Sequence, residues 1–300
     1  MITDKVKNSG YTRTLQWQTT EAYVQTTSFG MDDYLAMLDD SEFGIESIMA
    51  GAKLRIGVGR FPVRLENDAR EAVDKLLAYS ENPGYGSWRN RVTMIADDGD
   101  AGVHMNQTDK MMLPNLVATR KGADFRYEKI YLDAYPLSLE GTGASVPEAK
   151  NKMMQLFNSG TSVVNYIGHA NPREWTAEAL LTYTDITSMS NKNLPVFYTA
   201  TCQFARWDDD EISGGEIMWA NPTAGAIAMM STTRTVYISY NGTLSLNVGK
   251  YMFSTDTDAK AVRLGDVYRL AKNNFSSPDD NKLRYVLLGD PAMRMPMPYY

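Results

Sequence analysis

The chain is poor in the residues that form cross-links and metal sites, because its 300 residues include one cysteine and two histidines. A single cysteine excludes a disulfide within the chain. No apolar run approaches the roughly 18 residues that a membrane-spanning helix needs, and the N-terminal MITDKVKNSG lacks the charged-then-apolar pattern of a secretory signal. Basic residues are also in deficit, with 30 Lys and Arg against 36 Asp and Glu, which argues against a nucleic-acid partner.

From Arg91 onward, strand-like apolar runs alternate with helical patterns. The strand-like runs are RVTMIA, YEKIYLD, TSVVNYIG, LPVFYTAT and AGAIAMMST, and helical spacing occurs over 67–80, 108–121, 145–160 and 261–275. Strands that are apolar throughout and alternate with helices predict an α/β fold, with a mostly parallel sheet covered by helices on both faces. Capping-box patterns predict helix starts at Ser145 with Glu148 and at Ser213 with Glu216. In the helix over 67–80, the spacing predicts one apolar face, made of Ala69, Val73, Leu76 and Leu77.

The one cysteine and one of the histidines each follow an apolar strand directly. His169 comes after VVNYIG and Cys202 after PVFYTAT, and their separation of 33 residues (202 − 169) is about one βαβ unit. Parallel strands of such a unit are often neighbours, so both residues are expected at the carboxyl edge of the sheet. A thiol beside an imidazole is the pair that nucleophilic catalysis uses, which favours a catalytic dyad over an ordinary buried cysteine.

The same edge offers groups for the other catalytic roles. Asp97 and Asp98 end a third strand, RVTMIADD, so either carboxylate is placed to orient the imidazole. The backbone N–H groups of Ala170 and Cys202 are candidates for binding an oxyanion. Gly168 permits a tight turn before the histidine.

Other residues carry weaker signals. His104 lies in a loop and is interpreted as a surface or substrate-lining histidine, with a metal site formed with nearby acids as the alternative. Trp175 and Trp207 flank the dyad in the sequence and are candidates for walls of a substrate pocket, or for core residues. The acidic stretches invite comparison with structural calcium sites, although a solvated surface is the simpler interpretation; they comprise Asp32, Asp33, Asp39, Asp40, Asp208, Asp209, Asp210 and Glu211.

Four ordered segments resemble the gingipain family of cysteine peptidases (peptidase family C25) over about Asp32 to Pro291. They are GRFPV at 59–63, VVNYIGHANPREW at 163–175, LPVFYTATCQF at 194–204 and LLGDPAMR at 287–294. The resemblance implies a caspase-like α/β fold with two subdomains. It places a partial N-terminal subdomain at 1–80 and the catalytic subdomain at 81–300.

The resemblance also assigns roles to individual residues. Cys202 matches the family's nucleophile, His169 its general base and acid, and Asp98 the position of a glutamate that orients the histidine. Ala170 replaces a family glycine, so a methyl group enters the oxyanion corner. Met105 stands where arginine-specific members carry an acid, which argues against a preference for arginine and makes Met105 a substrate-binding candidate.

Three stretches resemble the sortase subgroup that serves type IX secretion: 32–40, 88–98 and 199–209. That subgroup implies an exported endopeptidase at the cell surface, associated with the outer membrane. Its substrates would be proteins with C-terminal sorting domains, its partners other outer-membrane secretion components, and no cofactor would be required. The alternatives are a catalytically inactive caspase-like scaffold domain, and a hydrolase or acyltransferase that acts on a non-peptide amide or ester.

Overall fold

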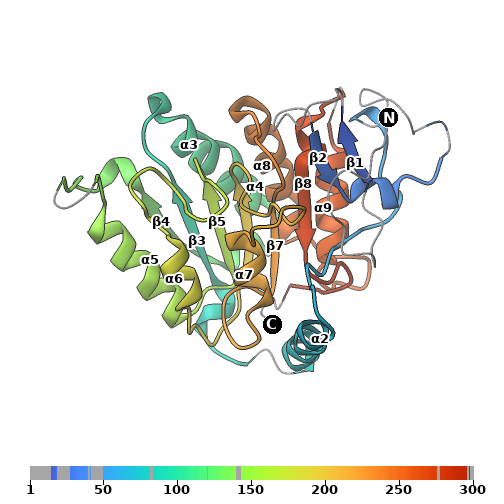
Figure 1. Cartoon of the computed structure of the whole chain (residues 1–300), viewed down its shortest axis with the longest axis horizontal. Helices are drawn as coiled ribbons and strands as arrows, with labels where there is room; N and C mark the ends of the chain where they lie inside the picture. The colour runs from blue at the N-terminus through green and yellow to red at the C-terminus, as the bar shows by residue number, and fades with distance from the viewer. Residues whose placement is uncertain are drawn as a thin grey trace.

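The computed structural model describes residues 15–18, 28–39, 41, 50–81, 84–119, 121–139, 143–275, 278–295 and 297. A six-stranded sheet with strand order β4-β3-β5-β6-β7-β8 forms its centre (Figure 1). The strands are β3 (Arg91–Ala96), β4 (Arg126–Tyr131), β5 (Val163–Ile167), β6 (Val196–Ala200), β7 (Ala228–Thr232) and β8 (Tyr285–Leu288). Each pair of neighbours from β4 to β7 is parallel, and β8 pairs with β7 antiparallel. The predicted fold class, a mostly parallel α/β sheet, is therefore confirmed.

Helices cover both faces of this sheet. One layer holds α5 (Pro147–Ser159), α6 (Tyr183–Thr187) and α7 (Gly214–Ala220), and the other holds α3 (Val103–Asn106), α4 (Leu113–Ala118), α8 (Ile238–Met252) and α9 (Leu264–Asn273) (Figure 1). A π-helical segment, Gln107–Met112, joins α3 to α4 into one continuous helix. Because β5, β6 and β7 are buried at every position, their sequences are mostly apolar on both faces rather than alternating between apolar and polar.

One of the two predicted capping boxes is wrong and the other is confirmed. The capping box at Ser145 and Glu148 is wrong, because Ser145 instead forms an antiparallel bridge with Ser138, and α5 begins at Pro147. The box at Ser213 and Glu216 is confirmed, with Glu216 Oε2 accepting hydrogen bonds from the Ser213 N–H and hydroxyl at 2.8 and 2.7 Å.

Helix α2 (Glu66–Glu81) buries Leu76 as its sequence predicts, but the rest of its buried face is different. Val73 and Leu77 are about half exposed, whereas the buried positions are Ala72, Lys75, Leu76 and Tyr79. Lys75 turns inward because its ammonium donates hydrogen bonds to backbone carbonyls, including that of Asn221 at 3.0 Å. Polar contacts therefore rotate this helix away from the orientation that its apolar pattern favours.

The N-terminal part packs on the C-terminal part of the chain. Strands β1 (Leu15–Gln18) and β2 (Ser28–Met31) form an antiparallel pair, and a small core of residues 29–54 includes Leu283. A buried ion pair joins Lys272 of α9 to Asp33 at 2.7 Å. Arg60 bridges to Leu288 of β8 in parallel orientation. The division at residue 80 remains a prediction.

Candidate active site

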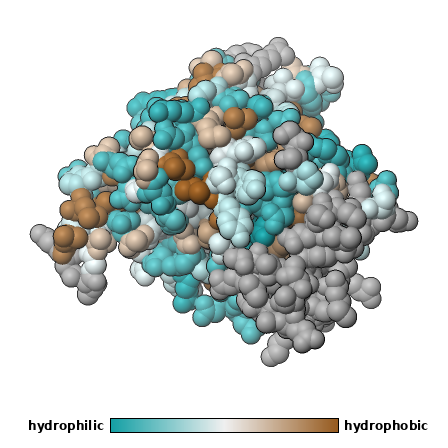
Figure 2. All heavy atoms as spheres, turned by 90° about the horizontal axis from the view of Figure 1, so that it is seen from above, coloured by the Kyte–Doolittle hydropathy of each residue, from teal (hydrophilic) through white to brown (hydrophobic). Residues whose placement is uncertain are grey.

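The register of the sheet brings the two dyad residues to one edge. Ile167 of β5 pairs with Ala200 of β6, so His169 and Cys202 each lie two residues beyond paired positions. Asp97 follows β3 at the same edge, and its N–H donates to the Ile167 carbonyl at 3.0 Å. Helix α3, which follows β3, lies at the top of Figure 1. Figure 2 views the molecule from this side and shows a largely hydrophilic surface with scattered hydrophobic patches.

The backbone of His169 is held by buried groups beneath it. Asp97 Oδ2 accepts the His169 N–H at 2.8 Å, and the Tyr166 hydroxyl donates to the His169 carbonyl. Gly168 is required at this turn, because a Cβ there would lie 2.4 Å from Asp97 Cβ and 2.6 Å from the Tyr166 hydroxyl. Above this support the imidazole is accessible, with 65% of the His169 side chain exposed.

The imidazole of His169 is oriented by Asp100. Its Nε2 lies 2.7 Å from Asp100 Oδ2, and this hydrogen bond is the main reason why the pKa of Asp100 falls below its usual value. Asp98, the predicted partner of the imidazole, instead donates its backbone N–H to Asp97 Oδ1 at 3.1 Å, and none of the described hydrogen bonds joins its carboxylate to the ring. Asp100 was missed from sequence because it lies in a loop, GDAG. Positive φ angles at Asp100 and Ala101 turn that loop back over the sheet edge.

Asp97 is a buried carboxylate that accepts hydrogen bonds from the backbone N–H groups of Asp98 and His169. Burial raises its pKa from 3.8 to about 6, although these hydrogen bonds and the positive charge of His169 act in the opposite direction. Asp97 therefore fixes the histidine turn, and Asp100 orients the ring. The sequence placed Asp97 at this edge without separating its role from that of Asp98.

Cys202 lies partly buried on the neighbouring strand end. Its Sγ accepts the Val236 N–H at 3.5 Å and donates to the Val236 carbonyl at 3.8 Å, and none of the described hydrogen bonds joins it to His169. Burial is the main cause that raises the pKa of the Cys202 thiol above its usual value. The thiol is therefore protonated at neutral pH, and a base must remove its proton before it can act as a nucleophile.

The turn after Cys202 is strained and firmly held. Gln203 has φ of +59°, which is unusual for a residue with a side chain, and its N–H donates to the Arg234 carbonyl at 3.2 Å. Neither Ala170 nor Cys202 donates its backbone N–H to any residue that the structure describes. Both predicted oxyanion donors therefore remain available for a ligand.

His104 belongs to the same cluster, which the sequence did not predict. Its side chain is buried, and its ring lies edge-on to that of His169 with centroids 5.0 Å apart. Its Nε2 lies 3.1 Å from Asp100 Oδ2, so one carboxylate oxygen contacts both imidazoles. Burial lowers the pKa of His104, and the neighbouring charge of His169 adds to this effect. The interpretation of His104 as a surface histidine is wrong.

The three substrate-binding candidates have different surroundings. Trp175 is completely buried and stacks on Tyr166 with ring centroids 4.2 Å apart, so it is a core residue and has no surface for a substrate. Trp207 is partly buried, and the Arg60 guanidinium stacks 3.7 Å from the centroid of its ring. Met105 is partly exposed on α3, next to His104. Substrate-binding roles for Trp207 and Met105 stay predictions.

Several of the acidic residues considered for calcium are paired with cations. Asp208 forms a buried, two-pronged ion pair with Arg234 at 2.6 and 2.7 Å. Asp32 is paired with Arg60, and Asp33 with Lys272. Asp40 lies outside the described residues. The paired carboxylates stabilise the packing of loops, and a structural calcium ion stays a prediction.

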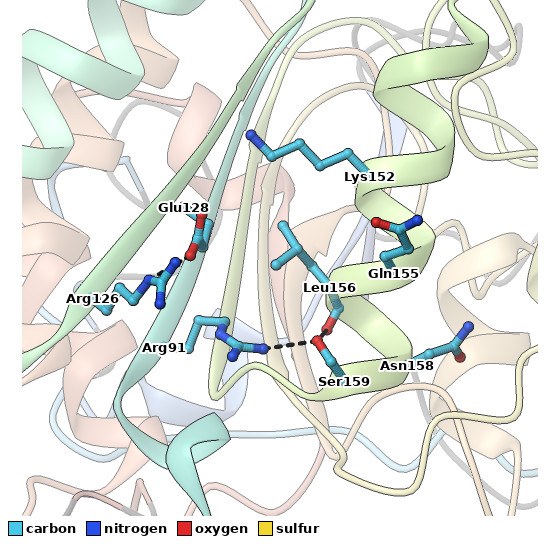
Figure 3. Close-up of a pocket in the computed structure, with 8 residues that line it drawn as sticks. All are labelled: Arg91, Arg126, Glu128, Lys152, Gln155, Leu156, Asn158 and Ser159. Atoms are coloured by element: carbon cyan, nitrogen blue, oxygen red, sulfur yellow. Dashed lines mark hydrogen bonds and ion pairs between the residues drawn. The ribbon is translucent and has the colours of Figure 1, made fainter.

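A hollow of about 720 Å³ lies at the opposite edge of the sheet, where β3 and β4 begin and α5 ends. Figure 3 shows Arg126 beside Glu128, and Arg91 linked to Ser159. The Arg91 guanidinium donates to Ser159 Oγ at 2.8 Å. Each of the hollow's cationic side chains makes at least one polar contact within the protein, since Lys152 also donates to the Lys129 carbonyl at 3.0 Å. Among the described helices, none is long and apolar enough to cross a membrane.

The parallel sheet with a cysteine and a histidine at its carboxyl edge has the architecture of the caspase-like cysteine peptidases. The family model of peptidase family C25 matches residues 6–296, so the chain belongs to this family. Comparison with the sequences of curated proteins gives no match.

Solved structures with a gingipain fold resemble the chain closely in architecture and weakly in sequence. The Arg-specific cysteine proteinase gingipain R matches with a TM-score of 0.69 and 14% identity, over 89% of this chain and 60% of that one. The complex of Porphyromonas gingivalis RgpB pro- and mature domains gives 0.67 and 14%, over 89% and 61%. A structure described only as a protease gives 0.66 and 16%, over 89% and 59%. The chain thus spans about three fifths of the length of these structures.

Proposed function

We propose that the chain is a cysteine endopeptidase with Cys202 as nucleophile and His169 as general base and acid. The observation that carries the proposal is the meeting of three strand ends at one edge, each bearing a chemically suitable group: Asp97, His169 and Cys202. Membership of peptidase family C25 supports it independently.

The hydrogen bonds define how the imidazole would act. Because Asp100 occupies Nε2 of His169, Nδ1 is the nitrogen left to take the thiol proton. The imidazole is exposed and free to move toward Sγ as a substrate binds, and catalytic hydrogen bonds often tighten only in the complex. The raised pKa of the Cys202 thiol makes this proton transfer part of the attack rather than a preceding ionisation.

The sequence of steps follows from these positions. Nδ1 of His169 takes the thiol proton as Sγ bonds to the scissile carbonyl carbon. The oxyanion accepts hydrogen bonds from the N–H groups of Ala170 and Cys202. The C–N bond then breaks, and the imidazolium gives its proton to the leaving amine, which leaves a thioester on Cys202. Water, or an acceptor amine, then attacks the thioester carbon as His169 takes its proton. The C–S bond breaks, and Sγ of Cys202 recovers a proton from the imidazolium.

The finer proposal is that the substrates are exported proteins with C-terminal sorting domains, cleaved at the cell surface in company with other outer-membrane components of type IX secretion. It is supported by the resemblance of 32–40, 88–98 and 199–209 to the sortase subgroup. Met105 on α3, beside the histidine pair, supports a substrate other than one with arginine at the scissile bond.

The test is cleavage of a cargo protein that carries a sorting domain, followed by mass spectrometry of intact products. Wild type is expected to release the domain, whereas Cys202→Ala and His169→Ala, confirmed as folded by circular dichroism, are expected to leave it intact. Products with an amine in place of water at the new C-terminus identify transfer. Cleavage by Cys202→Ala would overturn the proposal.

A matched pair of variants tests which carboxylate orients the imidazole. Asp100→Asn is expected to lower kcat/KM on the order of tenfold, because a neutral amide orients an imidazolium less well. Asp98→Asn removes the same charge from a neighbouring residue and is expected to lower it by less than about twofold. If Asp98→Asn lowers kcat/KM more than Asp100→Asn does, the orienting residue is Asp98.

A non-catalytic scaffold domain is the second candidate. It is favoured by the resting contacts, since Cys202 hydrogen bonds with the Val236 backbone while His169 faces Asp100. This candidate predicts that wild type and Cys202→Ala bind the same exported partner equally and that neither cleaves it. Absence of cleavage by wild type would therefore favour the scaffold.

A further inference from the structure

The carboxyl edge of the sheet carries a compact set of metal-ligating atoms. Asp97, His104 and His169 each offer one ligand atom, and these three atoms lie within 4.8 Å of one another. The residues come from three separate elements: the end of β3, helix α3 and the turn after β5. Two imidazoles and one carboxylate are a donor set that zinc uses in four-coordinate sites with one open position.

The hydrogen bonds to Asp100 leave Nδ1 of each histidine free to bind a metal ion. Asp100 Oδ2 lies 3.1 Å from His104 Nε2 and 2.7 Å from His169 Nε2, so each ring directs Nε2 to this carboxylate. A carboxylate on the outer nitrogen of a ligating histidine is the common second shell of zinc sites. The remaining nitrogen, Nδ1, then carries the lone pair that a metal ion requires.

His104 gives the strongest sign that a ligand is missing from its surroundings. Only 3% of this residue is exposed, and its Nδ1 has no hydrogen-bond partner among the described residues. Buried polar atoms are nearly always paired, so an unpartnered imidazole nitrogen beside a carboxylate and a second imidazole calls for an explanation. A metal ion at this point would satisfy it.

The carboxylate has both the charge and the free positions for the role. Asp97 accepts the His169 N–H at 2.8 Å, the Asp98 N–H at 3.1 Å and a longer contact from the Tyr166 hydroxyl at 3.5 Å, and a carboxylate offers about four acceptor positions in all. Asp98 and Glu178 place further carboxylate oxygens within 4.8 Å of that of Asp97, which makes the region attractive to a cation. The nitrogen donors favour a transition metal over Ca²⁺ or Mg²⁺, which prefer oxygen ligands.

We propose that Asp97, His104 and His169 form a binding site for Zn²⁺ that switches the peptidase off by occupying its catalytic imidazole. A bound ion takes the Nδ1 lone pair of His169, so that nitrogen can no longer accept the proton of Cys202. The inhibitory consequence rests on the proposed function, whereas the binding itself does not. Ligand atoms at about 2.1 Å from a tetrahedral zinc ion lie about 3.4 Å apart, which is compatible with ligand atoms that lie within 4.8 Å of one another.

Binding is tested directly, without an activity readout. After removal of metals with a chelator, wild type is titrated with ZnCl₂ in competition with a chromogenic zinc indicator. One Zn²⁺ per chain is expected, with Kd at or below the micromolar range, and MgCl₂ is not expected to compete. His104→Gln is expected to weaken binding at least tenfold. Failure of wild type to bind, or equal binding by His104→Gln, overturns the site.

The control is Cys202→Ala, which lacks the thiol but keeps all three proposed ligands. It is expected to bind Zn²⁺ as wild type does, and a tenfold loss would show a thiolate site and overturn the proposal. Binding of Co²⁺ to wild type tests the ligand set without any variant, so it remains informative even if His104→Gln fails to fold. A sulfur-to-cobalt charge-transfer band would contradict the nitrogen and oxygen ligand set.

Inhibition is then measured on the peptidase reaction. Cleavage by wild type is expected to fall as ZnCl₂ is added, with a midpoint equal to the Kd for Zn²⁺, and to return when a chelator is added. In His104→Gln, the midpoint of inhibition is expected to rise at least tenfold. Stoichiometric binding without inhibition overturns the switch. Binding by a protein that cleaves nothing leaves the site standing and counts against the peptidase alone.

Discussion

Replacing Asp97 by Asn should change how the stability of the protein depends on pH. The pKa of Asp97 rises from 3.8 to about 6 on folding, because burial disfavours its charged form. A carboxyl with a raised pKa contributes stability that is fully present below pH 3.8 and is lost as the pH rises through about 6. Asparagine has no proton to lose, so this dependence disappears in the variant.

The magnitude follows from the two pKa values. Between pH 4 and pH 7 the folded wild type gives up a proton that its unfolded chain has largely released already, and this costs about 2 kcal/mol of stability. Asp97 is only 2% exposed, so solvent screening reduces the figure little. The free energy of unfolding of Asp97→Asn, relative to wild type, should therefore rise by about 2 kcal/mol over this range.

The assay is urea denaturation at pH 4, 5, 6 and 7 with a chelator present, with tryptophan fluorescence and circular dichroism as probes. At each pH, the carboxamide of the Asp97→Asn variant retains one acceptor for the N–H groups of His169 and Asp98, and the unpaired N–H costs about 1–3 kcal/mol. Because this cost does not change with pH, it affects the measurements at all four pH values equally and can be separated from the titration of Asp97. Asp98→Asn is the matched control for the loss of one negative charge. A difference between wild type and Asp97→Asn that stays constant from pH 4 to pH 7 would refute the reasoning.

Three further predictions test the support of the site and the core. Gly168→Ala should abolish cleavage, because its Cβ would lie 2.4 Å from Asp97 Cβ, whereas Gly143→Ala, whose Cβ meets nothing within 4 Å, should leave kcat/KM unchanged. Lys272→Met should lower the free energy of unfolding by about 3–5 kcal/mol, because it leaves the buried carboxylate of Asp33 unpaired. In urea denaturation, the double variant Lys272→Met, Asp33→Leu should regain most of this loss. Equal losses in the single and the double variant would exclude a charge effect. In the protein without substrate, iodoacetamide should label Cys202 more slowly than free cysteine at pH 7 and faster as the pH rises above 9, because burial raises the thiol pKa; rapid, pH-independent labelling would indicate a resting thiolate.

The strands that hold the site could be predicted from the sequence. The runs that became β3, β5, β6 and β7 are mostly apolar without alternation, which is typical of strands buried on both faces. Helix α8 had no comparable signal, because Gly242 and Gly249 interrupt its pattern where it packs closely on the helix of α3 and α4. The rotation of α2 was equally hidden, since it depends on carbonyl groups that approach Lys75 from about 145 residues away in the chain.

The sequence by itself determined that Cys202 and His169 follow adjacent strands of a parallel sheet, because chain direction and strand length place both residues at one edge. Tertiary structure alone decided which carboxylate faces the imidazole. Asp97, Asp98 and Asp100 lie within four residues, and the difference between them depends on the positive φ angles of the loop that carries Asp100. Tertiary structure also brought His104 onto His169, because α3 folds back over the sheet edge and places two rings 5.0 Å apart that the chain separates by 65 residues (169 − 104). Spacing along a strand is a local property, whereas the orientation of a side chain at a site depends on every element that packs around it.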